Sequence, residues 1–163
     1  MVAAYENLTR DRRLKHIYNL CDFELRARKL LPKALAEYVF GGVEDNTTLA
    51  NNRRQFDDHT LLTRVLSDVS SRHTAHGLLG QTYAAPFGIA PVGVSALIAF
   101  NGDNVMASAA YKLGIPMILS GSSLTRLEEV KQHHPQVWFQ AYLPGQPDLQ
   151  DALIERVAAA GID

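Results

Sequence analysis

The chain has 163 residues, 47% of them hydrophobic and 20% charged, and its formal net charge at pH 7 is -1. This length is enough for one domain with a buried core, and the charge balance gives no support for nucleic-acid binding, which needs a basic surface. Cys21 is the only cysteine, which excludes an intrachain disulfide and a cysteine-based zinc site and is typical of a reducing compartment.

Residues 1–60 form the first predicted segment, which is helical. Three helices are expected there, at Arg12–Leu20, at Pro32–Phe40 and from Asp45 or Asn46 through Phe56. Proline suits the first turn of the second helix and Gly41-Gly42 suits its end, while Asp45 or Asn46 can cap the third. The polar N-terminus has no apolar core of the signal-peptide kind.

The stretch from Gly77 to Gly102 has no charged residue and is long enough to span a bilayer. Pro86 and Pro91 interrupt it, together with several glycines. We therefore expect two buried segments joined by a glycine loop rather than a membrane helix.

Residues 61–163 form the second predicted segment, where apolar runs alternate with helical patterns. The runs are PFGIAPVG, IPMILS and VWFQAY, and the helices are Asp103–Leu113, Leu124–His133 and Asp148–Ala160. This alternation predicts an α/β fold of about three parallel βα units. Because a closed (β/α)8 barrel has eight such units, the chain is expected to be a fragment or a half-barrel.

Ligands of parallel α/β folds bind beyond the carboxyl ends of the strands. The three predicted ends carry Pro91-Val92-Gly93, Ser120 to Ser123, and Gln140 with Tyr142. Strand periodicity places Trp138, Gln140 and Tyr142 on one face. These positions are the candidate site.

Each candidate also has a purely structural interpretation. Ser120 to Ser123 could cap the following helix, Pro91 to Gly93 could be an ordinary turn, and Gln140 could bond a neighbouring loop. Tyr38 is most simply a core tyrosine. The six histidines form no metal-ligating constellation, so no metal is expected, and HExxH, P-loop and GxGxxG motifs are missing from the sequence.

Taken in order, several stretches resemble the FMN-dependent α-hydroxy-acid oxidase and dehydrogenase family, which includes glycolate oxidase, L-lactate dehydrogenase and mandelate dehydrogenase. They are LPKALAEYVFGGVEDNTTLANNRRQF, RVLSDVS, APFGIAPVG, GIPMILSGSSLTRLEEV and WFQAY. The resemblance implies the N-terminal part of a (β/α)8 TIM barrel with extra N-terminal helices. It also implies FMN as cofactor and oxidation of a small, lactate-like L-2-hydroxy acid to the 2-oxo acid.

By the same resemblance, Tyr38 binds the substrate carboxylate and Tyr142 is a catalytic, substrate-facing residue. The cofactor-binding positions it implies are Pro91, Val92, Gly93, Ser120 and Gln140. Hydrogen bonds to a flavin ring tune its electronics, which is the protein's usual contribution to cofactor chemistry.

The chain also departs from the family. Glycolate oxidases carry tryptophan where this chain has Ser122, and the usual QLY is QAY here, with Ala141. The motifs that supply the family's catalytic histidine, substrate-binding arginines and flavin-contacting lysine have no counterpart in this sequence. The chain by itself is therefore expected to be inactive. One alternative is a non-catalytic fragment or interaction module that needs a partner half or an oligomer, and another is a phosphate- or flavin-binding barrel with an unrelated substrate.

The resemblance leaves the electron acceptor open among oxygen, a quinone and a cytochrome. It implies a homo-oligomer for full-length relatives. The expected location is cytoplasmic, with peripheral attachment to the inner face of a membrane left open.

Overall fold

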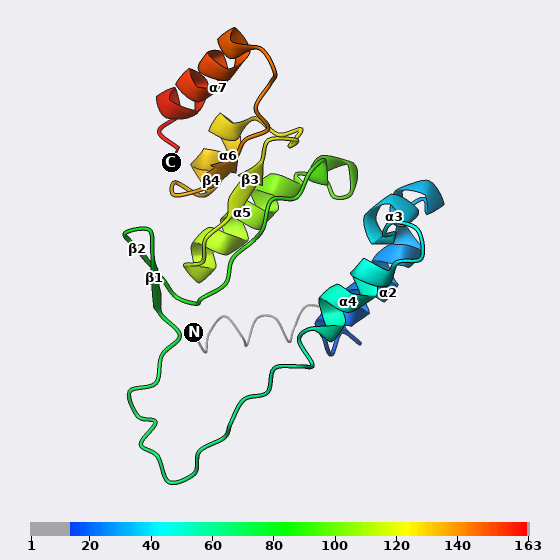
Figure 1. Ribbon diagram of the computed structural model, residues 1–163, viewed down its shortest axis with the longest axis vertical. Helices are drawn as coiled ribbons and strands as arrows, with labels where there is room; N and C mark the ends of the chain where they lie inside the picture. The colour runs from blue at the N-terminus through cyan, green and yellow to red at the C-terminus, as the bar shows by residue number, and fades with distance from the viewer. Residues whose placement is uncertain (1–13, 163) are drawn as a thin grey trace. The chain divides into compact units, whose positions relative to one another are not determined.

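The computed structural model describes residues 14–162 and groups the chain into two compact units that divide between Val65 and Leu66. Figure 1 shows the order of the elements along the chain. The first unit is helical and the second is α/β.

The first unit contains α2 (Leu20–Leu30), α3 (Lys33–Phe40) and α4 (Thr47–Arg54). The expected helix at Arg12–Leu20 is wrong within the described residues, because Asn19 caps α2 and the helix begins at Leu20. The Asn19 side chain accepts hydrogen bonds from the amides of Cys21 and Asp22, which satisfies two donors of the first turn. The prediction for α3 is confirmed. Asn46 is the N-cap position of α4 as predicted, but its side chain makes no cap hydrogen bond and accepts from the amide of Gly42 instead, and α4 ends before Phe56.

The second unit begins with an antiparallel hairpin, β1 (His76–Leu78) and β2 (Gln81–Tyr83). Leu79 and Gly80 both have positive φ, at 48° and 79°, as a two-residue type I′ turn requires. The expectation of a buried segment here is wrong, since every hairpin residue except Tyr83 is exposed. None of the helices within residues 14–162 is long and apolar enough to cross a bilayer.

Two further strands, β3 (Ile118–Ser120) and β4 (Trp138–Gln140), pair in parallel with Ser120 opposite Gln140. The strand expected at PFGIAPVG is reduced to one parallel bridge between Ile89 and Met117. Pro86 and Pro91 flank this bridge, and proline cannot donate to a strand ladder.

The helices of this unit are η2 (Ser95–Leu97), α5 (Gly102–Leu113), α6 (Leu127–His133) and α7 (Pro147–Ala159). Gly114, at φ 63°, ends α5 as predicted. The core lies between the strands and these helices, and its buried residues are Ala107, Ala110, Ile115, Met117, Leu119, Leu127, Val130, Val137 and Ile162. Helix α6 begins three residues later than predicted, because a turn at Ser123–Thr125 precedes it.

Candidate functional site

The carboxyl ends of the strands meet at one edge of the sheet. Ser120 lies opposite Gln140 across the β3–β4 pair, and the amide of Val94 donates to the carbonyl of Ser122 at 3.1 Å. A Cβ built on Gly93 would lie 3.4 Å from Ser122 Cβ and 3.9 Å from Ser120 Oγ. We call the segments 91–94, 120–123 and 140–142 together the carboxyl edge.

Gln140 is half-buried at this edge and is only loosely bonded. Its Oε1 accepts from Ser120 Oγ at 3.3 Å and from the amide of Gly121 at 3.4 Å, and its Nε2 donates to the carbonyl of Ala141 at 3.1 Å. The structural alternative of a bond to a neighbouring loop is therefore present in the geometry. Both bonds to Oε1 are long compared with typical values of about 2.7–3.0 Å, so a ligand can displace them at small cost.

Ser120 is 3% exposed, and its hydroxyl accepts from the amide of Ser122 at 3.1 Å while donating to Gln140. The buried Ser120 hydroxyl thus helps to orient the side chain of Gln140. The alternative that these serines cap the next helix is wrong, because the N-cap of α6 is Arg126, which makes no side-chain cap bond.

Gly121 is at a position where the backbone of β4 approaches closely. A Cβ there would lie 2.7 Å from the carbonyl oxygen of Gln140 and 3.2 Å from Cδ2 of Tyr142. The Tyr142 ring therefore lies beside Gly121, and the residue is 65% exposed at the edge. Strand β4 ends at Gln140, so the predicted shared face extends in the strand only from Trp138 to Gln140.

Tyr38 lies in α3 of the first unit and is 71% exposed. The interpretation as a core tyrosine is wrong, because Ala36 is the buried residue of that helix. Its role toward a substrate stays a prediction.

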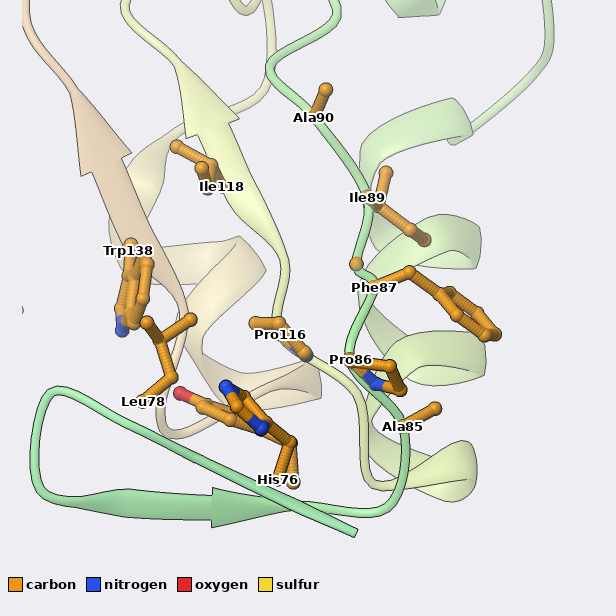
Figure 2. A pocket seen from close by; sticks show the side chains of 12 residues that line it. His76, Leu78, Ala85, Pro86, Phe87, Ile89, Ala90, Pro116, Ile118 and Trp138 are labelled. Atoms are coloured by element: carbon orange, nitrogen blue, oxygen red, sulfur yellow. The ribbon is translucent and has the colours of Figure 1, made fainter. Parts of the chain in front are cut away.

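A separate cavity of about 390 Å³ lies at the amino ends of the strands. Figure 2 shows His76 and Leu78 of the hairpin beside Trp138 and Pro116, with Ile118 further along β3. Ile118 and Trp138 alternate with the buried Met117, Leu119 and Val137, so they occupy the opposite face of the sheet. At its amino end this open face is lined mainly by apolar residues and offers no group of polar side chains comparable to the carboxyl edge.

Arg156 of α7 donates two hydrogen bonds to the carboxylate of Glu128 in α6, of 2.8 and 2.9 Å. The hydrogen bond from Arg156 lowers the pKa of Glu128 to about 2. Within residues 14–162, no group of three or more histidine, cysteine or acidic side chains could hold a metal ion.

The sequence model of the FMN-dependent dehydrogenase family matches residues 27–163. The chain belongs to this family. FMN is the cofactor of the family, and the match covers the carboxyl edge completely.

Among similar family members is an L-lactate dehydrogenase of Xanthobacter autotrophicus, 37% identical over 86% of this chain and 37% of that protein. An L-lactate oxidase of Lysinibacillus sphaericus is 32% identical over 87% of this chain and 37% of its own length. The crystal structure of a soluble mutant of the membrane-associated (S)-mandelate dehydrogenase from Pseudomonas putida is 30% identical. It superposes with a TM-score of 0.83 over 90% of this chain and 42% of that one.

The chain thus spans about two fifths of the length of these family members. Their fold confirms the predicted class, an α/β chain corresponding to the N-terminal part of a TIM barrel, and the described strands form no closed barrel.

The carboxyl edge of this family member fits an isoalloxazine ring chemically. The backbone amides of Val92 and Gly93 donate to no other backbone group in residues 14–162, and Val92 is exposed. The Gln140 amide is loosely bonded, and Gly121 lets the backbone of Gln140 approach closely. A few well-placed polar groups, such as these amides and Gln140, are what fixes the orientation of a polar-edged aromatic ring in a binding site.

Sequence reasoning missed the buried support of the edge. Asp103 of α5 is 1% exposed and its Oδ2 accepts from Ser123 Oγ at 2.7 Å. In the sequence, Asp103 shows only as an acidic residue at the start of a predicted helix, and such residues usually serve a favourable interaction with the helix dipole.

Proposed function

We propose that residues 27–163 supply one part of an FMN site of an L-2-hydroxy-acid dehydrogenase or oxidase, in which the carboxyl edge contacts the flavin ring. One observation carries the proposal. Three strand-end segments meet, the Val92 and Gly93 amides have no backbone partner among residues 14–162, and Gln140 is loosely bonded, in a chain that matches the FMN-dependent dehydrogenase family.

In this proposal each predicted residue has a definite task. The backbone of Pro91, Val92 and Gly93 runs along the ring, Gln140 bonds its polar edge, and Ser120 holds the glutamine in place. Tyr142, exposed at the same edge, faces the substrate, and Tyr38 binds the substrate carboxylate. A phenol hydroxyl can donate to a carboxylate or to the substrate's reacting oxygen.

The chemistry that bound FMN supplies is acceptance of the two electrons lost when a 2-hydroxy acid becomes a 2-oxo acid. The substrate hydroxyl must also lose its proton to a base, for which histidine is the most common residue. The described residues place no histidine at the carboxyl edge. We therefore propose that turnover needs a base from outside this set, and that the chain alone binds flavin without oxidising substrate.

The substrate we propose is small and lactate-like. The lactate enzymes named above are 32% and 37% identical to this chain, and the mandelate dehydrogenase is 30% identical. The acceptor is proposed to be oxygen, a quinone or a cytochrome, which the carboxyl edge does not distinguish. The proposed location is cytoplasmic or peripheral to the inner face of a membrane, and the proposed assembly is a homo-oligomer.

The test is titration of the purified chain with FMN, followed by flavin fluorescence, and an assay of L-lactate, glycolate and mandelate with a dye acceptor. We expect saturable FMN binding and no turnover. A chain that takes up no FMN contradicts the proposed site. Turnover above that of a Tyr142→Phe variant contradicts the proposed need for an outside base.

A second candidate is a non-catalytic interaction module, favoured by the open apolar face shown in Figure 2. Parallel sheets are normally covered on both faces, and the hairpin and neighbouring loop residues line only the cavity at the amino ends. A module of this kind would form an oligomer in size-exclusion chromatography with light scattering and would bind no FMN. A monomer that binds FMN rejects it.

A further inference from the structure

Asp103 is the most deeply buried acidic side chain that the structure describes near the carboxyl edge. It lies in the first turn of α5, is 1% exposed, and accepts a hydrogen bond from Ser123 Oγ at 2.7 Å. Burying a carboxylate is costly unless it is hydrogen-bonded, whereas hydrogen bonds to a charged acceptor are short and strong. The position at a helix N-terminus adds a favourable dipole interaction. Asp103 is therefore a strong anchor for Ser123.

Ser123 connects Asp103 to the loop between β3 and α6. Its hydroxyl oxygen accepts from the amide of Thr125 at 2.9 Å while its proton goes to Asp103. One side chain thus ties a turn of the loop to the start of α5. That loop starts at Gly121, directly after Ser120 of β3, and both residues donate to Oε1 of Gln140.

The start of α5 also supports the neighbouring strand end. A Cβ on Gly102 would lie 3.0 Å from Ser95 Oγ and 3.1 Å from the Ser95 carbonyl, so the helix start packs closely on the segment that follows Gly93. The Val94 amide then joins that segment to the carbonyl of Ser122. The first turn of α5 thus contacts one segment of the carboxyl edge, 120–123, and also Ser95, the residue directly after the segment 91–94.

We propose that Asp103, acting through the Ser123 hydroxyl, is a positioning residue for flavin at the carboxyl edge. The inference rests on the proposed function. Asp103 is buried, so it does not contact the ligand; it holds the 120–123 segment at the spacing from 91–94 and 140–142 that the ring requires. Loss of the Ser123–Asp103 hydrogen bond is expected to make the 120–123 segment more mobile while the second unit stays folded.

The experiment compares four variants of the full chain with the native chain. Ser123→Ala removes the donor, Ser123→Thr keeps a hydroxyl, and Asp103→Asn removes the charge with little change in size. Asp148→Asn is the matched control, because Asp148 is also acidic in a first helical turn, that of α7, but is exposed. The readouts are FMN affinity, the visible absorption band of the bound flavin, and hydrogen exchange at the Thr125 amide.

We expect Ser123→Ala and Asp103→Asn to weaken FMN binding about tenfold, the scale of one charge-assisted hydrogen bond. Both should shift the flavin band and speed exchange at Thr125. Ser123→Thr should restore all three readouts, and Asp148→Asn should change none. A purely structural role would lower stability but leave the affinity and the band of the folded chain unchanged.

Native-like FMN affinity and absorption in Ser123→Ala overturn the positioning role. Failure of the native chain to bind FMN instead overturns the proposed function. In that case unchanged Thr125 exchange in Ser123→Ala still overturns the anchor, because this measurement needs no flavin.

Discussion

The two faces of the β3–β4 sheet differ sharply in how they are covered. On one face Met117, Leu119 and Val137 are each 1% exposed and pack against α5 and α6. On the other, Ile118 and Trp138 are only half-buried and line the cavity of about 390 Å³ in Figure 2. We call these the covered face and the open face.

The comparison separates stability from chemistry within one small unit. The covered face carries the packing that fixes the strands, and apolar burial is the main favourable term in folding. Ser120 and Gln140 lie two residues after Ile118 and Trp138, so their side chains point to the same open face, at its carboxyl end. Gln140, which is proposed to meet the flavin, therefore lies where packing is incomplete, whereas its partner Ser120 is buried.

The largest expected effect comes from truncating the covered face. Leu119→Ala should lower the free energy of unfolding by about 2–5 kcal/mol, the usual cost of a large buried cavity. Ile118→Ala removes the same number of carbon atoms from the open face and should cost less than half as much. Urea unfolding measures both. Equal losses would show that the open face is packed in solution.

The next effect tests the close approach at the carboxyl edge. Gly121→Ala places a Cβ 2.7 Å from a backbone oxygen, so the two strand ends must separate, at roughly 1–3 kcal/mol. Gly145→Ala is the matched control, because nothing lies within 4 Å of its Cβ. Thermal unfolding compares them. Equal stability of the two variants would remove the evidence for tight packing at the edge.

A third prediction separates binding from stability. Gln140→Leu should weaken FMN binding about tenfold, or about 1.4 kcal/mol, while the free energy of unfolding changes little, because both bonds to its Oε1 are long. Gln136→Leu, just before β4 at its amino end, should leave affinity unchanged. Fluorescence titration measures both variants, and an equal loss in both would contradict the assignment to the carboxyl edge.

The smallest effect concerns pH. The pKa of Glu128 is about 2 in the folded chain, against an ordinary value of 4.5, because Arg156 hydrogen-bonds it. Its stabilisation is complete above about pH 4.5 and is lost as pH falls toward about 2. The Tm difference between native chain and Glu128→Gln should therefore shrink as pH falls through this range. Glu155→Gln, at an exposed glutamate of α7, is the matched control.

Much of the second unit is predictable because its signals are local. Gly114 ends α5 with a positive φ, and Pro147 starts α7, so both helices follow from short-range chemistry. The hairpin was missed because its apolar residues are exposed, which no hydrophobic pattern distinguishes from burial. The first strand was overestimated because Pro86 and Pro91 remove two ladder donors.

The site divides in the same way. The meeting of Ser120 with Gln140 could be foreseen, because parallel strands bring their carboxyl ends to one edge. The Asp103–Ser123 bond could not, because it joins residues 20 positions apart whose pairing depends on how α5 packs. Likewise the exposure of Tyr38 depends on which face of α3 is buried, which its short apolar pattern does not determine.

We propose that flavin lies at the carboxyl edge and not in the cavity at the amino ends of the strands. Hydrogen exchange of the full chain with and without FMN tests it most directly. We expect slower exchange in segments 91–94, 120–123 and 140–142, and unchanged exchange in the hairpin at 76–83. Protection confined to the hairpin and the cavity it lines, or no protection in the three edge segments, would contradict the account.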